Sequence, residues 1–300
     1  MNNYTAPDIW FPNLGISFEN VPRVFITVFG FEIFWYAIFI VLGILSAYLL
    51  AVWYAKRTGQ KPNDYTDLLI VGVILAFIGL RLYYMVFTWD SEQGGNFILE
   101  FLNFRGGGLA IYGGIIGALV AGIIVSAKKN IPFTTFTDTC APSLLLGQII
   151  GRFGNFFNRE AFGGPTDGLF AMRIRVDQSF MRTQELLDSA VYARGVQYFQ
   201  VHPTFLYEQF FNLLLMIFLL VYRPHKKFAG EIILLYMLGY GIIRFFLEGL
   251  RTDQLPFFGT GLAASQVMSV VFVVVAAGLL LAGHMYKPTK VEKSKSRSKK

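Results

Sequence analysis

Long apolar stretches are the feature of this sequence that most restricts its fold. An α-helix rises 1.5 Å per residue, so about 20 apolar residues cross the roughly 30 Å hydrocarbon core of a bilayer. Hydrophobic residues make up 54% of the chain and charged residues only 15%, against about 25% charged residues in soluble domains. The chain is therefore predicted to be an all-α polytopic membrane protein. We expect seven transmembrane helices, near 31–54, 67–88, 108–127, 138–158, 204–222, 230–250 and 264–286.

The distribution of Lys and Arg between the loops predicts the orientation of these spans. Short loops at 56–61, 128–129 and 223–227 are basic, and seven Lys or Arg lie in the last fourteen residues, 287–300. All of these segments fall on one side when the spans alternate. The positive-inside rule assigns that side to the cytoplasm. The N-terminus is then expected outside and the C-terminus in the cytoplasm.

One membrane domain, 1–286, is expected to account for almost the whole chain. The only sizeable extramembrane segment, 159–203, is mixed polar and is expected to form a small outward-facing cap. The basic tail at 287–300 is expected to be disordered. It is predicted to touch anionic lipid headgroups rather than nucleic acid.

Polar side chains within the apolar stretches gather at one depth. Ionisable groups in hydrocarbon are costly and usually functional. Six helices carry such groups toward the outer surface, and we expect nothing comparable in the inner halves. The residues at this depth are Tyr36, Arg81, Tyr112, Arg152, Asn155, Asn158, Glu160, His202, Glu208, Tyr240, Arg244 and Glu248. We predict that Arg81, Arg152 and Arg244 face one cavity and bind a phospholipid phosphate, because guanidinium binds phosphate bidentately.

Simpler interpretations of these residues stay open at this point. Tyr240, Arg244 and Glu248 are spaced i, i+4 and i+8, and Arg251 follows at i+11, so all four share one helix face. Arg244 and Glu248 could satisfy each other without any ligand. Asn155 and Asn158 could equally hydrogen-bond to neighbouring helices. The combination of all these groups favours a site.

Several classes of membrane enzyme are excluded by missing motifs. The chain has neither a Gly-x-Ser-x-Gly nor a His-Glu-x-x-His motif, and His202, His225 and His284 are too scattered for a typical zinc site. No metal or cofactor is expected. Direct transfer between two substrates, with the protein supplying position and charge stabilisation, fits this residue set.

A lipid or anion transporter using the same arginines is the main alternative. Transporters place polar groups at the membrane midplane and on both sides of it. The predicted concentration at the outer surface favours the enzyme.

Four motifs resemble one known family. The stretch at 151–163 has the sequence GRFGNFFNREAFG, which resembles the signature of the bacterial prolipoprotein diacylglyceryl transferases. GGLAIYGG at 107–114, HPTFLYE at 202–208 and YGIIRFFLE at 240–248 agree in order and spacing, as does the early Trp-Tyr pair at 35–36. The resemblance covers nearly the whole chain except the tail.

The resemblance implies a reaction and its partners. The family moves the sn-1,2-diacylglyceryl group of phosphatidylglycerol to the thiol of the lipobox cysteine of a prolipoprotein and releases glycerol 1-phosphate. It implies a multi-pass protein of the bacterial cytoplasmic membrane with its active site toward the outer leaflet. Phosphatidylglycerol, lipobox segments and membrane lipids are the expected partners, and nucleic acid is not.

Matching the motifs residue by residue implies roles for individual side chains. Arg152 and Arg244 would hold the phosphate and stabilise the leaving group, with Tyr112 as a third catalytic position. The remaining expected substrate-binding residues are Tyr36, Arg81, Asn155, Asn158, Glu160, Gly163, His202, Glu208, Tyr240 and Glu248. Cys140 begins the fourth span on the cytoplasmic side, so it is not expected to be the reacting thiol.

Tyr112 departs from the family pattern. Many members carry a histidine there, and that histidine has been proposed as the base for the thiol. A phenol of pKa about 10 is a poor base for a thiol of pKa about 8.5. Either His202 or Glu208 supplies the base, or an electropositive cavity favours the thiolate without a strong base.

Overall fold

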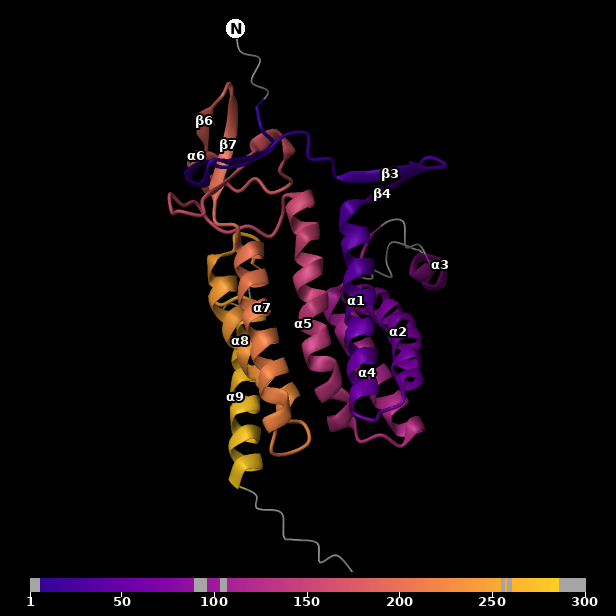
Figure 1. Cartoon of the computed structure of the whole chain (residues 1–300). Helices are drawn as coiled ribbons and strands as arrows, with labels where there is room; N and C mark the ends of the chain where they lie inside the picture. The colour runs from indigo at the N-terminus through magenta and orange to yellow at the C-terminus, as the bar shows by residue number, and fades with distance from the viewer. Residues whose placement is uncertain (1–5, 89–95, 103–106, 255–256, 258–260, 286–300) are drawn as a thin grey trace, which may run out of the picture.

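The computed structural model describes residues 6–88, 96–102, 107–254, 257 and 261–285. Long helices run side by side beneath a cap that contains β-strands (Figure 1). The helix α9 ends at the opposite end of the bundle from the cap. The predicted basic tail, 287–300, lies outside the described residues.

Within the described part of the chain, seven long helices form the bundle. They are α1 (Trp35–Arg57), α2 (Pro62–Thr88), α4 (Ile111–Lys129), α5 (Phe133–Asn158), α7 (Thr204–Tyr222), α8 (Glu231–Leu250) and α9 (Ala264–Met285). Each overlaps a predicted span. Among the described residues, six of the seven are long and apolar enough to cross a membrane, and α5 is the exception.

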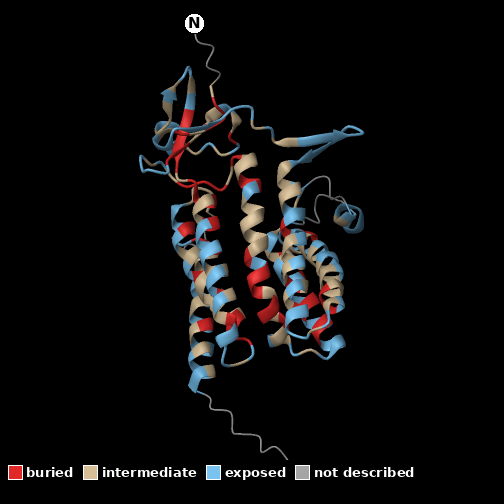
Figure 2. Ribbon diagram, viewed as in Figure 1, coloured by how far each residue is buried: buried red, intermediate tan, exposed pale blue. Residues whose placement is uncertain are grey.

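The helix α5 lies at the centre of the bundle. It packs against α1 on one side and against α7 and α8 on the other, while α2 pairs with α4 and α9 with α8. In α1, a Cβ on Gly43 would lie 2.9 Å from the carbonyl oxygen of Gly147 in α5, so these helices approach backbone to backbone. Figure 2 shows the buried residues concentrated in α5 and in the cap, with exposed residues along the outer helices.

The cap contains an antiparallel sheet that the sequence did not predict. Its strand order is β2-β1-β5-β7-β6, and Ile9 pairs with Ile174 across the join between the N-terminal strands and the rest. The strands are β1 (Ile9–Phe11), β2 (Ile16–Phe18), β5 (Met172–Arg175), β6 (Val191–Ala193) and β7 (Val196–Val201). The all-α prediction is therefore wrong for the cap, because strands of three to six residues leave no long apolar stretch.

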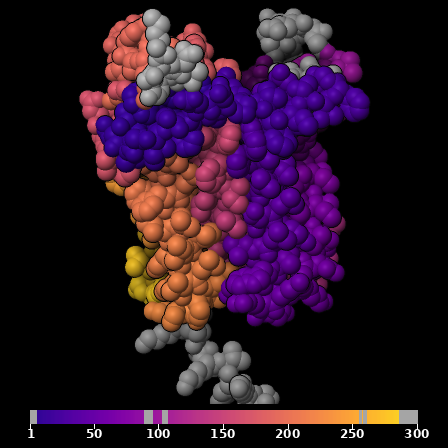
Figure 3. Space-filling view, turned by 45° about the horizontal axis from the view of Figure 1, so that its top comes forward, coloured from indigo at the N-terminus to yellow at the C-terminus, as the bar shows by residue number. Residues whose placement is uncertain are grey.

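The cap is also larger than the predicted 159–203 segment. The N-terminal segment lies across its face in the space-filling view (Figure 3). Ile9 and Phe11 pack with Phe162, Met172 and Phe199 in a buried apolar core. The short helical segments are η1 (Pro12–Leu14), η4 (Val176–Gln178), α6 (Gln184–Asp188) and, at the other end of the molecule, η5 (Arg223–His225).

A β-hairpin precedes the first long helix. Strands β3 (Val24–Val28) and β4 (Phe31–Phe34) project sideways from the start of α1, on the same side as the short helix α3 (Phe97–Leu102) (Figure 1). The predicted first span began at 31, but residues 31–34 are strand and the helix begins at Trp35. Phe29 at the hairpin turn is 97% exposed, which suits contact with an apolar phase better than with water.

Candidate active site

Two arginines and two glutamates from three helices form one connected network beneath the cap. Nη2 of Arg152 (α5) lies 2.7 Å from Oε1 of Glu208 (α7). The other oxygen of Glu208 lies 2.9 Å from Nη1 of Arg244 (α8), and Nη2 of Arg244 lies 2.6 Å from Glu248 one turn further on. We call these four residues the charge network.

The arginines of the charge network remain partly open although the glutamates are buried. The side chains of Glu208 and Glu248 are 3% and 7% exposed, against 20% for Arg152 and 14% for Arg244. A guanidinium has five N–H donors. Arg152 directs bonds to Asn155 and Glu208, and Arg244 to Glu208 and Glu248. Both therefore keep donors that an anionic ligand can reach.

The charge network decides whether Arg244 and Glu248 of α8 are a self-contained ion pair or part of a larger site. Arg244 and Glu248 do pair, as the i, i+4 spacing predicts. They are not a self-contained pair, because Arg244 also binds Glu208, which in turn binds Arg152. Tyr240 completes the same face with its hydroxyl 3.4 Å from Oε1 of Glu208.

The two predicted asparagines hold a third carboxylate at the end of α5. Nδ2 of Asn155 donates to Oε1 of Glu160 at 3.0 Å, and Nδ2 of Asn158 donates to the same oxygen at 3.3 Å. Between them and Glu160, Arg159 ends the helix with a φ of 55° and turns the chain back. The asparagines thus bind within their own segment, and the interpretation that they bond to neighbouring helices is not supported.

Tyr36 reaches this corner because Gly154 leaves space for it. A Cβ on Gly154 would lie 2.6 Å from Cδ2 of Tyr36 and 3.2 Å from its Cα. The Tyr36 hydroxyl is within electrostatic range of Glu160 and Arg152. The close approach of α1 to α5 therefore adds Tyr36 to the site.

Gly163 joins three segments around His202. Its N–H donates to the carbonyl oxygen of His202 at 2.8 Å, and it forms an antiparallel bridge with Arg251. A Cβ there would lie 2.6 Å from the carbonyl oxygen of Leu250. Nδ1 of His202 lies 3.4 Å from the hydroxyl of Tyr207, and burial lowers the pKa of the imidazole below its ordinary 6.5. These close contacts account for a glycine at position 163 through packing alone, without a bound ligand.

Arg81 does not belong to the charge network. Its side chain is buried in α2 and donates to the carbonyl oxygens of Phe101 at 3.3 Å, Gly107 at 2.6 Å and Gly108 at 3.1 Å. It also pairs with Glu100 at 3.3 Å. These contacts hold the chain between α2 and α4, and they give the prediction that Arg81 shares the phosphate cavity no support.

Tyr112 lies at the start of α4, within electrostatic range of Glu248 and Arg244. Its ring centroid is 6.3 Å from that of Tyr83. The hydroxyl forms no hydrogen bond with a described residue. The structure thus places Tyr112 beside the network without a partner that would make its phenol a stronger base.

Three residues after α8 extend the network beyond the predicted site. Nε of Arg251 lies 3.9 Å from Glu248, and its Nη2 lies 2.5 Å from Oδ2 of Asp253. Gln254 donates to the carbonyl oxygen of Glu248 at 2.6 Å. The helical spacing already placed Arg251 on the face of Tyr240, Arg244 and Glu248, whereas Asp253 and Gln254 follow the helix and fit no periodic pattern.

The charges around the site nearly balance. Arg152, Arg244 and Arg251 face the carboxylates of Glu160, Glu208, Glu248 and Asp253. An electropositive cavity that by itself stabilises a thiolate is therefore not supported by this arrangement. Within the described ranges, no group of three or more His, Cys, Asp or Glu side chains is placed to hold a metal ion.

Buried charges also occur at the opposite end of the bundle, which the sequence did not predict. Asp138 in α5 is fully buried and accepts hydrogen bonds from the backbone N–H groups of Gly230 at 2.9 Å and Ile233 at 3.0 Å. Lys226 pairs with it at 3.1 Å. A carboxylate at a helix N-terminus is favourable, so Asp138 fixes the start of α8. The expectation that the inner halves carry nothing comparable is wrong.

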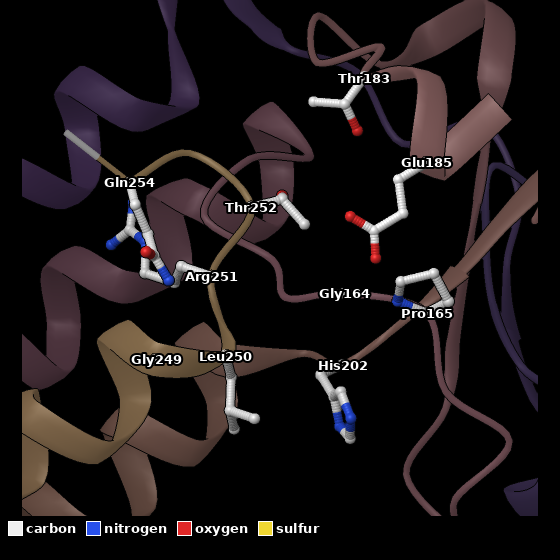
Figure 4. A pocket seen from close by; sticks show the side chains of 10 residues that line it. All are labelled: Gly164, Pro165, Thr183, Glu185, His202, Gly249, Leu250, Arg251, Thr252 and Gln254. Atoms are coloured by element: carbon white, nitrogen blue, oxygen red, sulfur yellow. The ribbon is translucent and has the colours of Figure 1, made fainter. Parts of the chain in front are cut away.

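A cavity of about 470 Å³ opens between the cap and the end of α8. Figure 4 shows Thr183, Glu185, His202, Arg251, Thr252 and Gln254 among the residues around it. Arg251 thus lines this cavity and also pairs with Glu248 of the charge network.

Comparisons with known proteins agree with the motifs. The family model described as prolipoprotein diacylglyceryl transferase matches residues 23–282. A protein of Finegoldia magna named phosphatidylglycerol–prolipoprotein diacylglyceryl transferase is 41% identical over 262 residues, 86% of this chain and 94% of that protein. Proteins of the same name from Clostridioides difficile and Bacillus cereus are 40% identical over 252 residues (84% of this chain, 91% of theirs) and 38% over 264 (87% and 91%). The chain belongs to the prolipoprotein diacylglyceryl transferase family.

Proposed function

We propose that this chain transfers the sn-1,2-diacylglyceryl group of phosphatidylglycerol to the lipobox cysteine thiol of prolipoproteins, releasing glycerol 1-phosphate. The observation that carries the proposal is the pair of partly open guanidiniums, Arg152 and Arg244, held on one buried carboxylate. The names of the relatives supply the two substrates.

The charge network suits a leaving phosphate. In the reaction, the cysteine sulfur bonds to the terminal glyceryl carbon and the bond from that carbon to the phosphate oxygen breaks. The electron pair stays on the phosphate oxygen, so negative charge grows there. Guanidinium donors fixed in advance stabilise such charge without reorganising. Glu208 holds Arg152 and Arg244 in place, and their remaining donors meet the phosphate.

His202 is a candidate base because it lines the same cavity as Arg251, which lies 3.9 Å from Glu248 of the charge network. Burial lowers the pKa of its imidazole, so the neutral form predominates at neutral pH. Both carboxylate oxygens of Glu208 are already bound to guanidinium groups, which makes it a less available acceptor. We infer that His202, rather than Tyr112 or Glu208, takes the thiol proton.

We also propose that all seven long helices cross the bacterial cytoplasmic membrane, with the cap and the N-terminus outside. Six of the described helices have the required length and hydropathy, and α5 is shielded by α1, α7 and α8. Thiol labelling tests the orientation in a Cys140→Ser background. A membrane-impermeant reagent should label Gln197→Cys in the cap of intact cells but not Lys128→Cys at the other end, and the reverse result would invert the topology.

The transferase itself is tested with purified protein, phosphatidylglycerol and a lipobox peptide. Mass spectrometry should find the thioether-linked diacylglyceryl peptide. Arg152→Ala should lower the rate at least 100-fold, in line with the loss of a charge-stabilising donor. The matched control is Arg57→Ala. Arg57 is exposed and lies at the end of α1 that is away from the cap, so this variant should retain activity. A folded wild-type protein that forms no product would overturn the proposal.

A transporter remains the second candidate because buried charges occur at both ends. The group around Asp138 is occupied by backbone N–H groups and Lys226, which favours a structural role there. Export of labelled phosphatidylglycerol from liposomes without any thioether product would favour transport.

A further inference from the structure

The cavity between the cap and α8 has a polar wall that the transfer reaction leaves unexplained. Figure 4 shows the Glu185 carboxylate and the Thr183 side chain directed into the space above Gly164 and Pro165. Both residues belong to the cap, at α6 and the residue before it. Thr252 approaches from the segment that follows α8. The volume of the cavity, about 470 Å³, is within the ordinary range for ligand sites.

We propose that this cavity binds the prolipoprotein segment that immediately follows the lipobox cysteine, and that Glu185 selects against acidic residues in that segment. The proposal rests on the proposed transferase function. It assigns a peptide-binding role to part of the cap.

Continuity with the charge network places the peptide there. Arg251 lines the cavity and also lies 3.9 Å from Glu248, the last member of the network. When the substrate cysteine reacts beside Arg244, the apolar segment of the prolipoprotein that precedes this cysteine lies among the helices. The chain after the cysteine must leave away from the bundle, and the cavity lies on the cap side of α8 (Figure 4).

The charges of the lining give the cavity a preference. Arg251 is matched by Asp253 at 2.5 Å and by Glu248. Glu185, in contrast, has no ion-pair partner among the described residues. Its carboxylate is free to accept hydrogen bonds from peptide N–H groups or to attract a basic side chain. A carboxylate of the substrate in the same space would be repelled, which is how binding sites commonly exclude a wrong ligand.

The test compares lipobox peptides that differ only in the residue after the cysteine, with Ser, Lys or Asp there. For the wild-type protein we expect a KM for the Asp peptide about tenfold above that of the Ser peptide, the size of a moderately screened like-charge contact. Glu185→Gln should reduce this ratio to about twofold, and Glu185→Lys should invert the preference between Asp and Lys peptides.

Asp188→Asn is the matched control. Asp188 is an exposed carboxylate on the same short helix, bound to Gln184 rather than facing the cavity, so its variant should keep the wild-type ratio. An equal ratio in wild type and Glu185→Gln would overturn the proposal. So would a Glu185→Gln effect on the KM for phosphatidylglycerol alone, which would make the cavity a lipid-headgroup site.

Failure of this inference and failure of the proposed function give different results. If the Ser peptide gains a diacylglyceryl group while peptide charge and Glu185 have no influence, only the peptide-binding proposal fails. If no peptide is modified by the folded wild-type protein, the transferase proposal fails as well. Thermal unfolding of each variant checks that the exposed substitutions leave the fold intact.

Discussion

Oε1 of Glu208 in α7 lies 2.7 Å from Nη2 of Arg152 in α5. The second oxygen of the same carboxylate lies 2.9 Å from Nη1 of Arg244 in α8. One buried side chain thereby links three helices. In the protein without substrate, Glu208 binds the same two arginines that we propose the anionic phosphate approaches.

Removing the charge of Glu208 should destabilise the protein. Glu208→Gln leaves two guanidiniums with one buried carboxylate partner fewer, and breaking a buried ion pair from one side costs about 3–5 kcal/mol. We expect a clearly lower Tm in neutral detergent. Added phosphatidylglycerol should raise the Tm of the variant more than that of the wild type, because the phosphate replaces the missing charge. A variant as stable as the wild type would show that Glu208 does not hold the network together.

Tyr112→Phe should keep substantial transferase activity, within about tenfold of wild type. The Tyr112 hydroxyl forms no hydrogen bond with a described residue, and a phenol of pKa about 10 is a poor acceptor for a thiol proton. Initial rates of thioether formation measure the effect, with Arg152→Ala as the inactive reference. If Tyr112→Phe is as inactive as Arg152→Ala, our assignment of the base is wrong.

Gly163→Ala should damage the junction between the cap and α8, whereas Gly164→Ala should not. A Cβ on Gly163 would lie 2.6 Å from the carbonyl oxygen of Leu250, while a Cβ on Gly164 would meet nothing within 4 Å. The first variant should lose both Tm and activity because a backbone atom must move. The two neighbouring glycines form a controlled comparison, and similar behaviour of both variants would contradict the packing role.

His202 should make stability depend on pH below about 6.5. Burial lowers the pKa of the folded imidazole from 6.5, so in this range the unfolded chain binds more protons than the folded protein. The linkage relation then makes stability rise with pH up to about 6.5, and fall as the pH drops toward the folded pKa. Tm measured across this range should change less for His202→Gln.

The same variant tests the proposed base. If His202 accepts the thiol proton, His202→Gln should lower kcat far more than it lowers Tm near neutral pH. Unchanged kcat would remove His202 from the mechanism.

Much of the helical framework follows from local sequence. Apolar stretches predicted all seven long helices because hydropathy needs no knowledge of partners, and the i, i+4 spacing of Arg244 and Glu248 allowed for the pair that they form. The cap was beyond such reasoning. Ile9 and Ile174 pair across the sheet although 165 positions separate them, and no local pattern encodes that partnership.

Depth along a helix could be predicted, but direction around it could not. Arg81 and Arg152 have similar predicted depths, yet Arg81 binds the carbonyl oxygens of Gly107 and Gly108, whereas Arg152 faces Glu208. Which face of α2 meets which neighbour depends on packing of the whole bundle. Asp138 was missed for a related reason, because its backbone partners at Gly230 and Ile233 lie at the start of another helix.

The polarity of α5 has a consequence for how the protein is made. Asp138, Gln148 and Arg152 leave this helix without the hydropathy that its six companions have, and a translocon releases helices into lipid according to that property. The earlier-made α1 packs along α5, and the later α7 and α8 complete its surroundings. In the proposed seven-span topology, the helix that carries Arg152 is thus a poor independent membrane segment, and its stability in the bilayer would depend on neighbours synthesised both before and after it.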